Sequence, residues 1–133
     1  MNTFKKKWNH KSVKDWGSTM SDEANEFVED FIKMLERQLG KEGVNIEIEP
    51  YHYELSGYVE KDGKYIYIFY GLPRGGYAID FSTSDCLEGV LYRAADNNHD
   101  YKGYANNFSS IQDLPRKIME MFDNYERYTI GRI

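Results

Sequence analysis

Apolar residues recur every three or four positions between residues 21 and 39, which is the spacing of one buried helix face. These apolar positions are Ala24, Phe27, Val28, Phe31, Ile32, Leu35 and Leu39. Ser21 suits the N-cap, because its hydroxyl can accept a hydrogen bond from a free backbone N–H. Asp22 and Glu23 suit the first turn, where the helix dipole favours anions. Gly40 is a typical C-terminal stop, so the pattern predicts one helix from Ser21 to Gly40.

From Val44 onward the apolar period changes to two, which is typical of half-buried strands. The first series is Val44, Ile46 and Ile48, and the series after Pro50 is Tyr51, Tyr53, Leu55 and Val59. Because the apolar parity changes across Pro50, we expect a turn or bulge there. Asp62-Gly63 predicts a hairpin. The returning segment 65–70 (YIYIFY) is apolar on both faces, as in a central or doubly covered strand.

The rest of the chain alternates strand patterns with polar segments. The breaker-rich residues 71–76 (GLPRGG) predict a loop. Residues 77–81 predict a fourth strand, and residues 87–94 predict either a fifth strand or a helical turn. Residues 95–109 predict a long polar loop. Ser110 is expected to cap a second helix that tolerates Pro115 in its first turn. The tail from Asn124 adds a last strand or stays loose.

The order of helix, strands and helix, with short connections, predicts an α+β fold. We expect an antiparallel four- to five-stranded meander with two helices packed on one face. Residues 1–20 are expected to form a basic, partly ordered arm, and residues 21–133 a single α+β domain. Within the arm, a short helix from Trp8 to Trp16 and direct docking of these tryptophans on the core are both open.

Charge is unevenly distributed along the chain. The net charge of −5 divides into +4 over residues 1–20 and −9 over the remainder. An acidic body repels nucleic-acid phosphates and attracts basic proteins. The single cysteine, Cys86, excludes an internal disulfide and fits a reducing compartment. No stretch has the apolar length of a membrane span or of a signal core, so we expect no membrane partner and a cytoplasmic protein.

The sequence offers little for catalysis. The histidines and Cys86 are not at metal-ligand spacing, and no phosphate-binding or dinucleotide glycine pattern is present. We therefore expect no catalytic residue, no metal and no cofactor. A ligand loop in which Arg74 or Arg93 holds an anion remains an alternative to a turn with solvated arginines.

The predicted sheet face that points away from the helices combines aromatic and acidic residues. We expect it to carry the partner-binding residues Glu47, Glu49, Glu54, Tyr58, Tyr65, Tyr67, Phe69 and Asp80. Aromatic anchors within charged surroundings suit a protein interface, and the negative charge favours a basic, nucleic-acid-handling partner. The alternative is that the arm, the tail or a second copy of the chain covers these aromatics, as in a homodimer.

The segment 91–118 (LYRAADNNHDYKGYANNFSSIQDLPRKI) resembles the C-terminal part of small accessory proteins of phages and conjugative elements of Gram-positive bacteria. The short, acidic, tyrosine-rich chain is similar in style to that population, which includes anti-CRISPR proteins. The resemblance implies a host-defence inhibitor that acts by binding, since many anti-CRISPR proteins present acids where a nuclease expects DNA phosphates. The alternatives are an immunity protein against a toxin nuclease, and a small enzyme or ligand-binding domain that uses loops 71–76 and 95–109.

Overall fold

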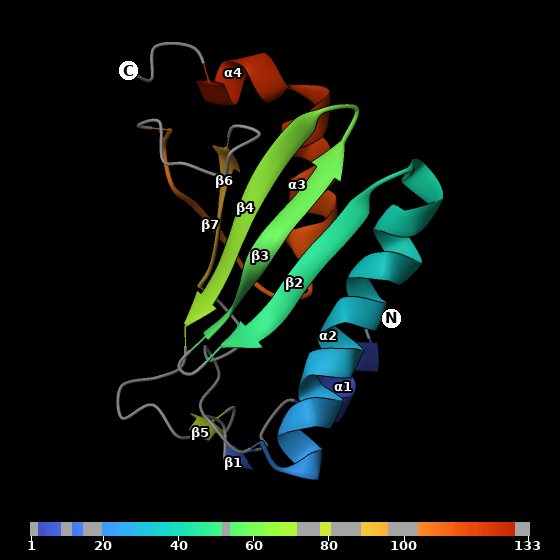
Figure 1. Ribbon diagram of the computed structural model, residues 1–133, viewed down its shortest axis with the longest axis vertical. Coiled ribbons are helices and arrows are strands. Elements are labelled where there is room, and N and C mark those ends of the chain that lie inside the picture. The colour runs from blue at the N-terminus through green and yellow to red at the C-terminus, as the bar shows by residue number, and fades with distance from the viewer. Residues whose placement is uncertain are drawn as a thin grey trace.

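An antiparallel sheet of five strands, with helices on one of its faces, forms the body of the protein (Figure 1). The computed structural model describes residues 3–8, 12–14, 20–51, 54–71, 78–80, 89–95 and 104–129. In spatial order the strands are β2 (Asn45–Tyr51), β3 (Glu54–Lys61), β4 (Lys64–Gly71), β6 (Val90–Ala95) and β7 (Asn107–Ser109). The predicted α+β class, with the order helix, strands, helix, is confirmed.

The long helix α2 (Asp22–Leu39) begins where the sequence predicts it. Ser21 Oγ accepts a hydrogen bond from the Ala24 N–H at 3.0 Å, which satisfies one of the free donors of the first turn. A 3₁₀ turn, η1 (Gly40–Glu42), follows the helix and leads into β2. Gly40 itself has helical dihedral angles, and the left-handed residue that reverses the chain is Gly43.

The core lies between the sheet and the helices α2 and α3 (Leu114–Asp123). The inward-facing strand residues are aligned across the sheet, as in the row Ile46, Val59, Ile66 and Ala94. Phe27, Phe31 and Leu35 of α2 are fully buried against this face, together with Ile118 of α3. Each such side chain contributes about 1.5–3 kcal/mol by leaving water, so this packing determines which face of the sheet stays outside.

The N-terminal helix α1 (Thr3–Trp8) packs against α2. Phe4 and Trp8 lie four residues apart, on one side of α1, and both are buried. Their rings contact Phe27 at centroid distances of 5.4 and 5.3 Å. Trp8 Nε1 donates a hydrogen bond to Asp30 Oδ2 at 2.9 Å. The helix thus precedes the Trp8–Trp16 segment, where β1 (Ser12–Lys14) is found instead.

The segments 77–81 and 87–94 both contain a strand as predicted, but the neighbours of the strands differ from the predicted meander, because strand pairing is a long-range property. The predicted fourth strand is β5 (Ala78–Asp80), but it pairs with β1 in a separate two-stranded sheet. The neighbour of β4 is β6, the predicted fifth strand. The fifth strand of the main sheet is β7, which lies inside the predicted polar loop 95–109 and is too short to show a period.

Two predicted boundaries also shift. Pro50 lies inside β2, opposite Leu55, and β2 ends at Tyr51. An edge strand tolerates proline, because one side of its backbone needs no N–H donor. The second helix begins at Leu114 after the N-cap Asp113, while Ser110 Oγ accepts from the Asp113 N–H at 3.3 Å in the preceding turn.

The tail forms the helix α4 (Tyr125–Thr129), so the expectation of a last strand or a loose segment from Asn124 is wrong. The Tyr125 hydroxyl fixes this helix to the end of the sheet. It lies 2.7 Å from the Tyr65 carbonyl and 2.9 Å from the Ala95 carbonyl, and it accepts from the Tyr65 N–H at 3.3 Å. A hydroxyl has one proton, so it donates to one of the two carbonyls at a time.

Candidate protein-binding surface

The sheet face opposite α2 and α3, here called the outer face, carries a row of four side chains from four strands. Glu47 of β2 pairs with Tyr58 of β3, Tyr58 with Tyr67 of β4, and Tyr67 with Arg93 of β6. We call these four residues the central row. Residues directly opposite on antiparallel strands have Cβ atoms about 4.5–5.5 Å apart, so register alone brings an acid, two tyrosines and an arginine together.

Most of the predicted partner-binding residues share this face. Their strand positions place Glu47, Glu49, Glu54, Tyr58, Tyr65, Tyr67 and Phe69 on the outer side. Asp80 does not join them, because β5 belongs to the two-stranded sheet. Arg74 lies outside the described residues. Arg93, proposed from sequence for a ligand loop, lies on strand β6 at the end of the central row.

The central row is held by ring contacts. The rings of Tyr58 and Tyr67 have a centroid distance of 5.3 Å and an interplanar angle of 50°. Arg93 Cζ lies 4.8 Å from the centroid of the Tyr67 ring, which is a cation–π distance. Arg93 Nη1 also donates to Asn106 Oδ1 at 3.2 Å, so the guanidinium is fixed in place above the ring.

A polar cluster lies beside the row. Ser56 has 5% of its surface exposed, and its hydroxyl donates to Glu54 Oε2 at 2.6 Å. Burial raises the pKa of the Tyr67 phenol, and the Glu54 and Tyr58 charges raise it further, while Arg93 and a hydrogen bond with Ser56 act in the opposite direction. Tyr67 is therefore a neutral phenol in the folded protein at physiological pH.

The acids of the outer face differ in what they already bind. Glu60 accepts from Asn45 Nδ2 at 2.7 Å and from the Gly63 N–H at 2.8 Å, and these two bonds lower its pKa. Glu54 is bonded to Ser56. Glu47 and Glu49 are exposed, and within the described part of the chain no hydrogen bond or ion pair engages either one. The negative charge available to a partner is therefore concentrated on β2.

The opposite side of the outer face is apolar. Phe69 and Leu91 are half-buried and directly paired, and Leu91 pairs with Phe108 of β7, whose surface is 62% exposed. The Phe69 ring covers Gly71, since a Cβ at Gly71 would lie 2.9 Å from the ring. Phe108 borders a recess of about 260 Å³ that Lys117 also lines. The outer face thus passes from free carboxylates on β2 to exposed aromatic surface on β7.

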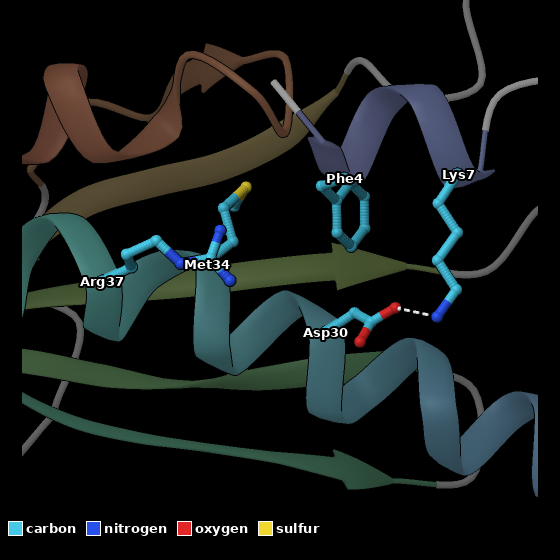
Figure 2. Close-up of a pocket in the computed structure, with 5 residues that line it drawn as sticks. All are labelled: Phe4, Lys7, Asp30, Met34 and Arg37. Carbon is cyan, nitrogen blue, oxygen red and sulfur yellow. Dashed lines mark ion pairs between the residues drawn. The ribbon is translucent and has the colours of Figure 1, made fainter. Parts of the chain in front are cut away.

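A second candidate is the recess between α1 and α2, lined by Phe4, Lys7, Asp30, Met34 and Arg37 (Figure 2). Its volume of about 140 Å³ is below the roughly 300–1,000 Å³ of small-molecule sites. Lys7 Nζ is engaged by Asp30 Oδ2 at 2.9 Å and by Glu26, as the dashed contact to Asp30 shows. These ion pairs raise the pKa of Lys7. The recess is best understood as the joint that holds α1.

Within the described ranges, no group of three or more His, Cys, Asp or Glu residues is placed to hold a metal ion. No helix among them has the length and apolar character needed to cross a membrane. Comparisons with protein-family models, with curated proteins and with solved structures find no match to this chain. The geometry of the outer face therefore carries the functional argument.

Sequence reasoning missed Ser56, Leu91 and Phe108 as members of the outer face, and it placed Arg93 elsewhere. The alternation of the apolar Tyr92 and Ala94 with Arg93 could have predicted that Arg93 lies on the outer side of β6. The position of Phe108 had no local signal, because β7 has only three residues.

Proposed function

We propose that this protein is a non-enzymatic inhibitor that binds a basic, nucleic-acid-handling protein through its outer face. The observation that carries the proposal is the pair of uncommitted carboxylates, Glu47 and Glu49, next to the tyrosines of the central row and on the same face as the exposed Phe108. Aromatic residues supply the contact energy of protein interfaces, and complementary charge supplies orientation and fast association.

The sign of the charge favours a protein over a nucleic acid. Stacked aromatics on an antiparallel sheet are also a means of binding single-stranded nucleic acid, but such surfaces combine the rings with basic groups that track the phosphates. Here the described outer face has the acids Glu47, Glu49, Glu54 and Glu60, and its basic residue is Arg93. A basic surface that normally holds phosphates is the complementary partner.

The sign of the charge and the resemblance noted above support one host process. We propose an anti-CRISPR-like protein of a phage or other mobile genetic element, acting in the cytoplasm on a CRISPR effector nuclease. Such a protein occupies the basic channel of the nuclease and excludes DNA. The acidic body of the chain supports this mode, because its charge has the sign of the phosphates that it replaces.

The test is capture of partners by the immobilised protein at low and high salt, followed by mass spectrometry and a DNA-cleavage assay of the captured nuclease. We expect salt-sensitive capture of one basic protein, because exposed charge pairs are screened by salt. The double variant Glu47→Lys, Glu49→Lys should weaken binding by about ten-fold or more, since charge pairs at interfaces are worth about 1.5 kcal/mol or more.

The matched control reverses two charges that do not lie on the outer face. Glu29 and Glu36 are exposed on α2, so the double variant Glu29→Lys, Glu36→Lys changes net charge equally. If both double variants weaken capture to the same extent, attraction depends on net charge and the outer face is not the binding surface. If neither does, the acidic inhibitor proposal is wrong.

A further inference from the structure

We infer that the outer face recognises an arginine side chain of its partner, which stacks on Tyr58 and pairs with the Glu47 carboxylate. The inference rests on the proposed function, because it names the chemical group that the same surface receives. The inference ranks arginine above lysine as the group that this surface binds.

The protein itself contains the arrangement that we assign to the complex. Arg93 lies over Tyr67 at 4.8 Å, and Tyr67 is the cross-strand neighbour of Tyr58. A guanidinium is planar and weakly hydrated, so it stacks on an aromatic ring while its N–H groups remain available in the ring plane. Lysine can also place its ammonium over a ring, as Lys7 does over Trp8 at 5.4 Å, but this compact, strongly hydrated group has no planar fork that covers the ring and pairs with a carboxylate at the same time.

The second half of the arrangement is a carboxylate at the side of the ring. Glu47 is directly opposite Tyr58, and Glu49 is the diagonal neighbour, opposite Ser56. A guanidinium that covers the Tyr58 ring is therefore within reach of the Glu47 carboxylate and can form the paired N–H···O bonds typical of arginine.

The state of the four acids identifies the end of the row that binds. Glu54 and Glu60 already accept hydrogen bonds from Ser56, Asn45 and Gly63. Glu47 and Glu49 are exposed, and no described contact compensates their charge. The other end of the row already has its guanidinium, Arg93. The exposed acids of β2 therefore mark the end of the row at which we place the partner's arginine.

The experiment compares two fluorescein-labelled peptides, nona-arginine and nona-lysine, by fluorescence anisotropy with the full chain at low salt. The two peptides have equal charge, so attraction to the net charge alone does not distinguish them. We expect the arginine peptide to bind about five-fold more tightly, which corresponds to one cation–π contact. Ring-proton resonances of Tyr58 should shift on titration with the arginine peptide, and those of Tyr125 should not.

Variants separate the ring from the carboxylate. Tyr58→Leu should reduce the preference for arginine to the part that the paired N–H···O bonds with Glu47 supply. Tyr58→Phe retains an aromatic face and should retain the preference. Glu47→Gln should weaken binding of the arginine peptide more than binding of the lysine peptide. Circular dichroism and thermal unfolding show whether each variant is folded. If Tyr58→Leu does not fold, Tyr58→Phe and Glu47→Gln still test whether the arginine preference depends on this ring and this carboxylate.

Each remaining outcome overturns the inference. Equal affinities of the wild-type protein for the two peptides, or a preference that is undiminished in Tyr58→Leu, remove the arginine site but leave the proposed function standing. Failure to bind either peptide, together with undiminished partner capture by Glu47→Lys, Glu49→Lys, refutes both. If the protein forms a dimer that Glu47→Lys, Glu49→Lys dissociates, a second copy of the chain occupies the outer face and the foreign partner is wrong.

Discussion

Gly57 permits the close approach of β2 and β3 that brings Glu47 beside Tyr58, so Gly57→Ala is the most informative test of the sheet geometry. A Cβ at this position would lie 1.9 Å from the Glu47 carbonyl oxygen and 2.7 Å from Ile48 Cα. Both atoms belong to the backbone, so no side chain can rotate away. Non-bonded carbon atoms need about 3.5 Å, and the two strands must therefore separate by more than about 1 Å.

The cost can be worked out from this displacement. Forcing an extra methyl group into a packed position costs about 1–3 kcal/mol, and each ladder hydrogen bond that is broken adds about 1 kcal/mol. We expect Gly57→Ala to lower the free energy of unfolding by about 3–4 kcal/mol, a large part of the 5–15 kcal/mol typical of a domain. The assay is urea denaturation followed by circular dichroism.

Gly40→Ala is the matched control. Gly40 has helical dihedral angles, and a Cβ there would meet nothing within 4 Å. Because alanine has fewer unfolded conformations than glycine, this variant should gain about 0.4–1 kcal/mol. A loss below about 1 kcal/mol for Gly57→Ala would refute the close approach, and with it the placement of Glu47 relative to Tyr58.

Three further predictions concern contacts described above. Tyr125→Phe should lower the free energy of unfolding, measured by thermal denaturation, by about 1–3 kcal/mol. Two strand carbonyls lose a shared donor in this variant, and one strand N–H loses its acceptor. Trp8→Phe should lower the free energy of unfolding by about 1–3 kcal/mol, because it removes buried ring volume and leaves Asp30 without the indole N–H. An unchanged denaturation midpoint would show that α1 is not docked as described. The pKa of Tyr67 is raised in the folded state, so the stability it contributes is complete below the ordinary tyrosine pKa and is lost as pH rises through the raised value. Ultraviolet titration of the wild type against Tyr67→Phe should isolate this phenol, and Glu54→Gln should bring its pKa closer to the ordinary range.

The elements predicted correctly are those defined by local patterns. The helix from residue 22 to 39 follows from three-four spacing and from Ser21 as its cap, both of which act within one turn. The outer position of Glu47, Tyr58 and Phe69 follows from the period of two, because neighbouring side chains of a strand point to opposite faces. These properties need no knowledge of which strands are neighbours.

The elements that were missed depend on long-range pairing. Residues 78–80 have a strand pattern, but nothing local shows that they pair with residues 12–14 and leave β4 to pair with β6. For the same reason the sequence could not place Arg93 over Tyr67, since that contact exists only in the β4–β6 register. Nor could it show that Glu54 and Glu60 accept hydrogen bonds while no contact within the described segments engages Glu47 or Glu49.

The central row also gives the outer face a direction. A cation lies at its β6 end and an anion at its β2 end, with the two tyrosine rings between them. A partner turned by half a revolution about the sheet normal would bring its own cation against Arg93 and leave Glu47 without a counter-ion. The same shape can therefore be accepted in one orientation and rejected in the other, so a single site of cross-linking on β2 should report a single pose of the bound protein.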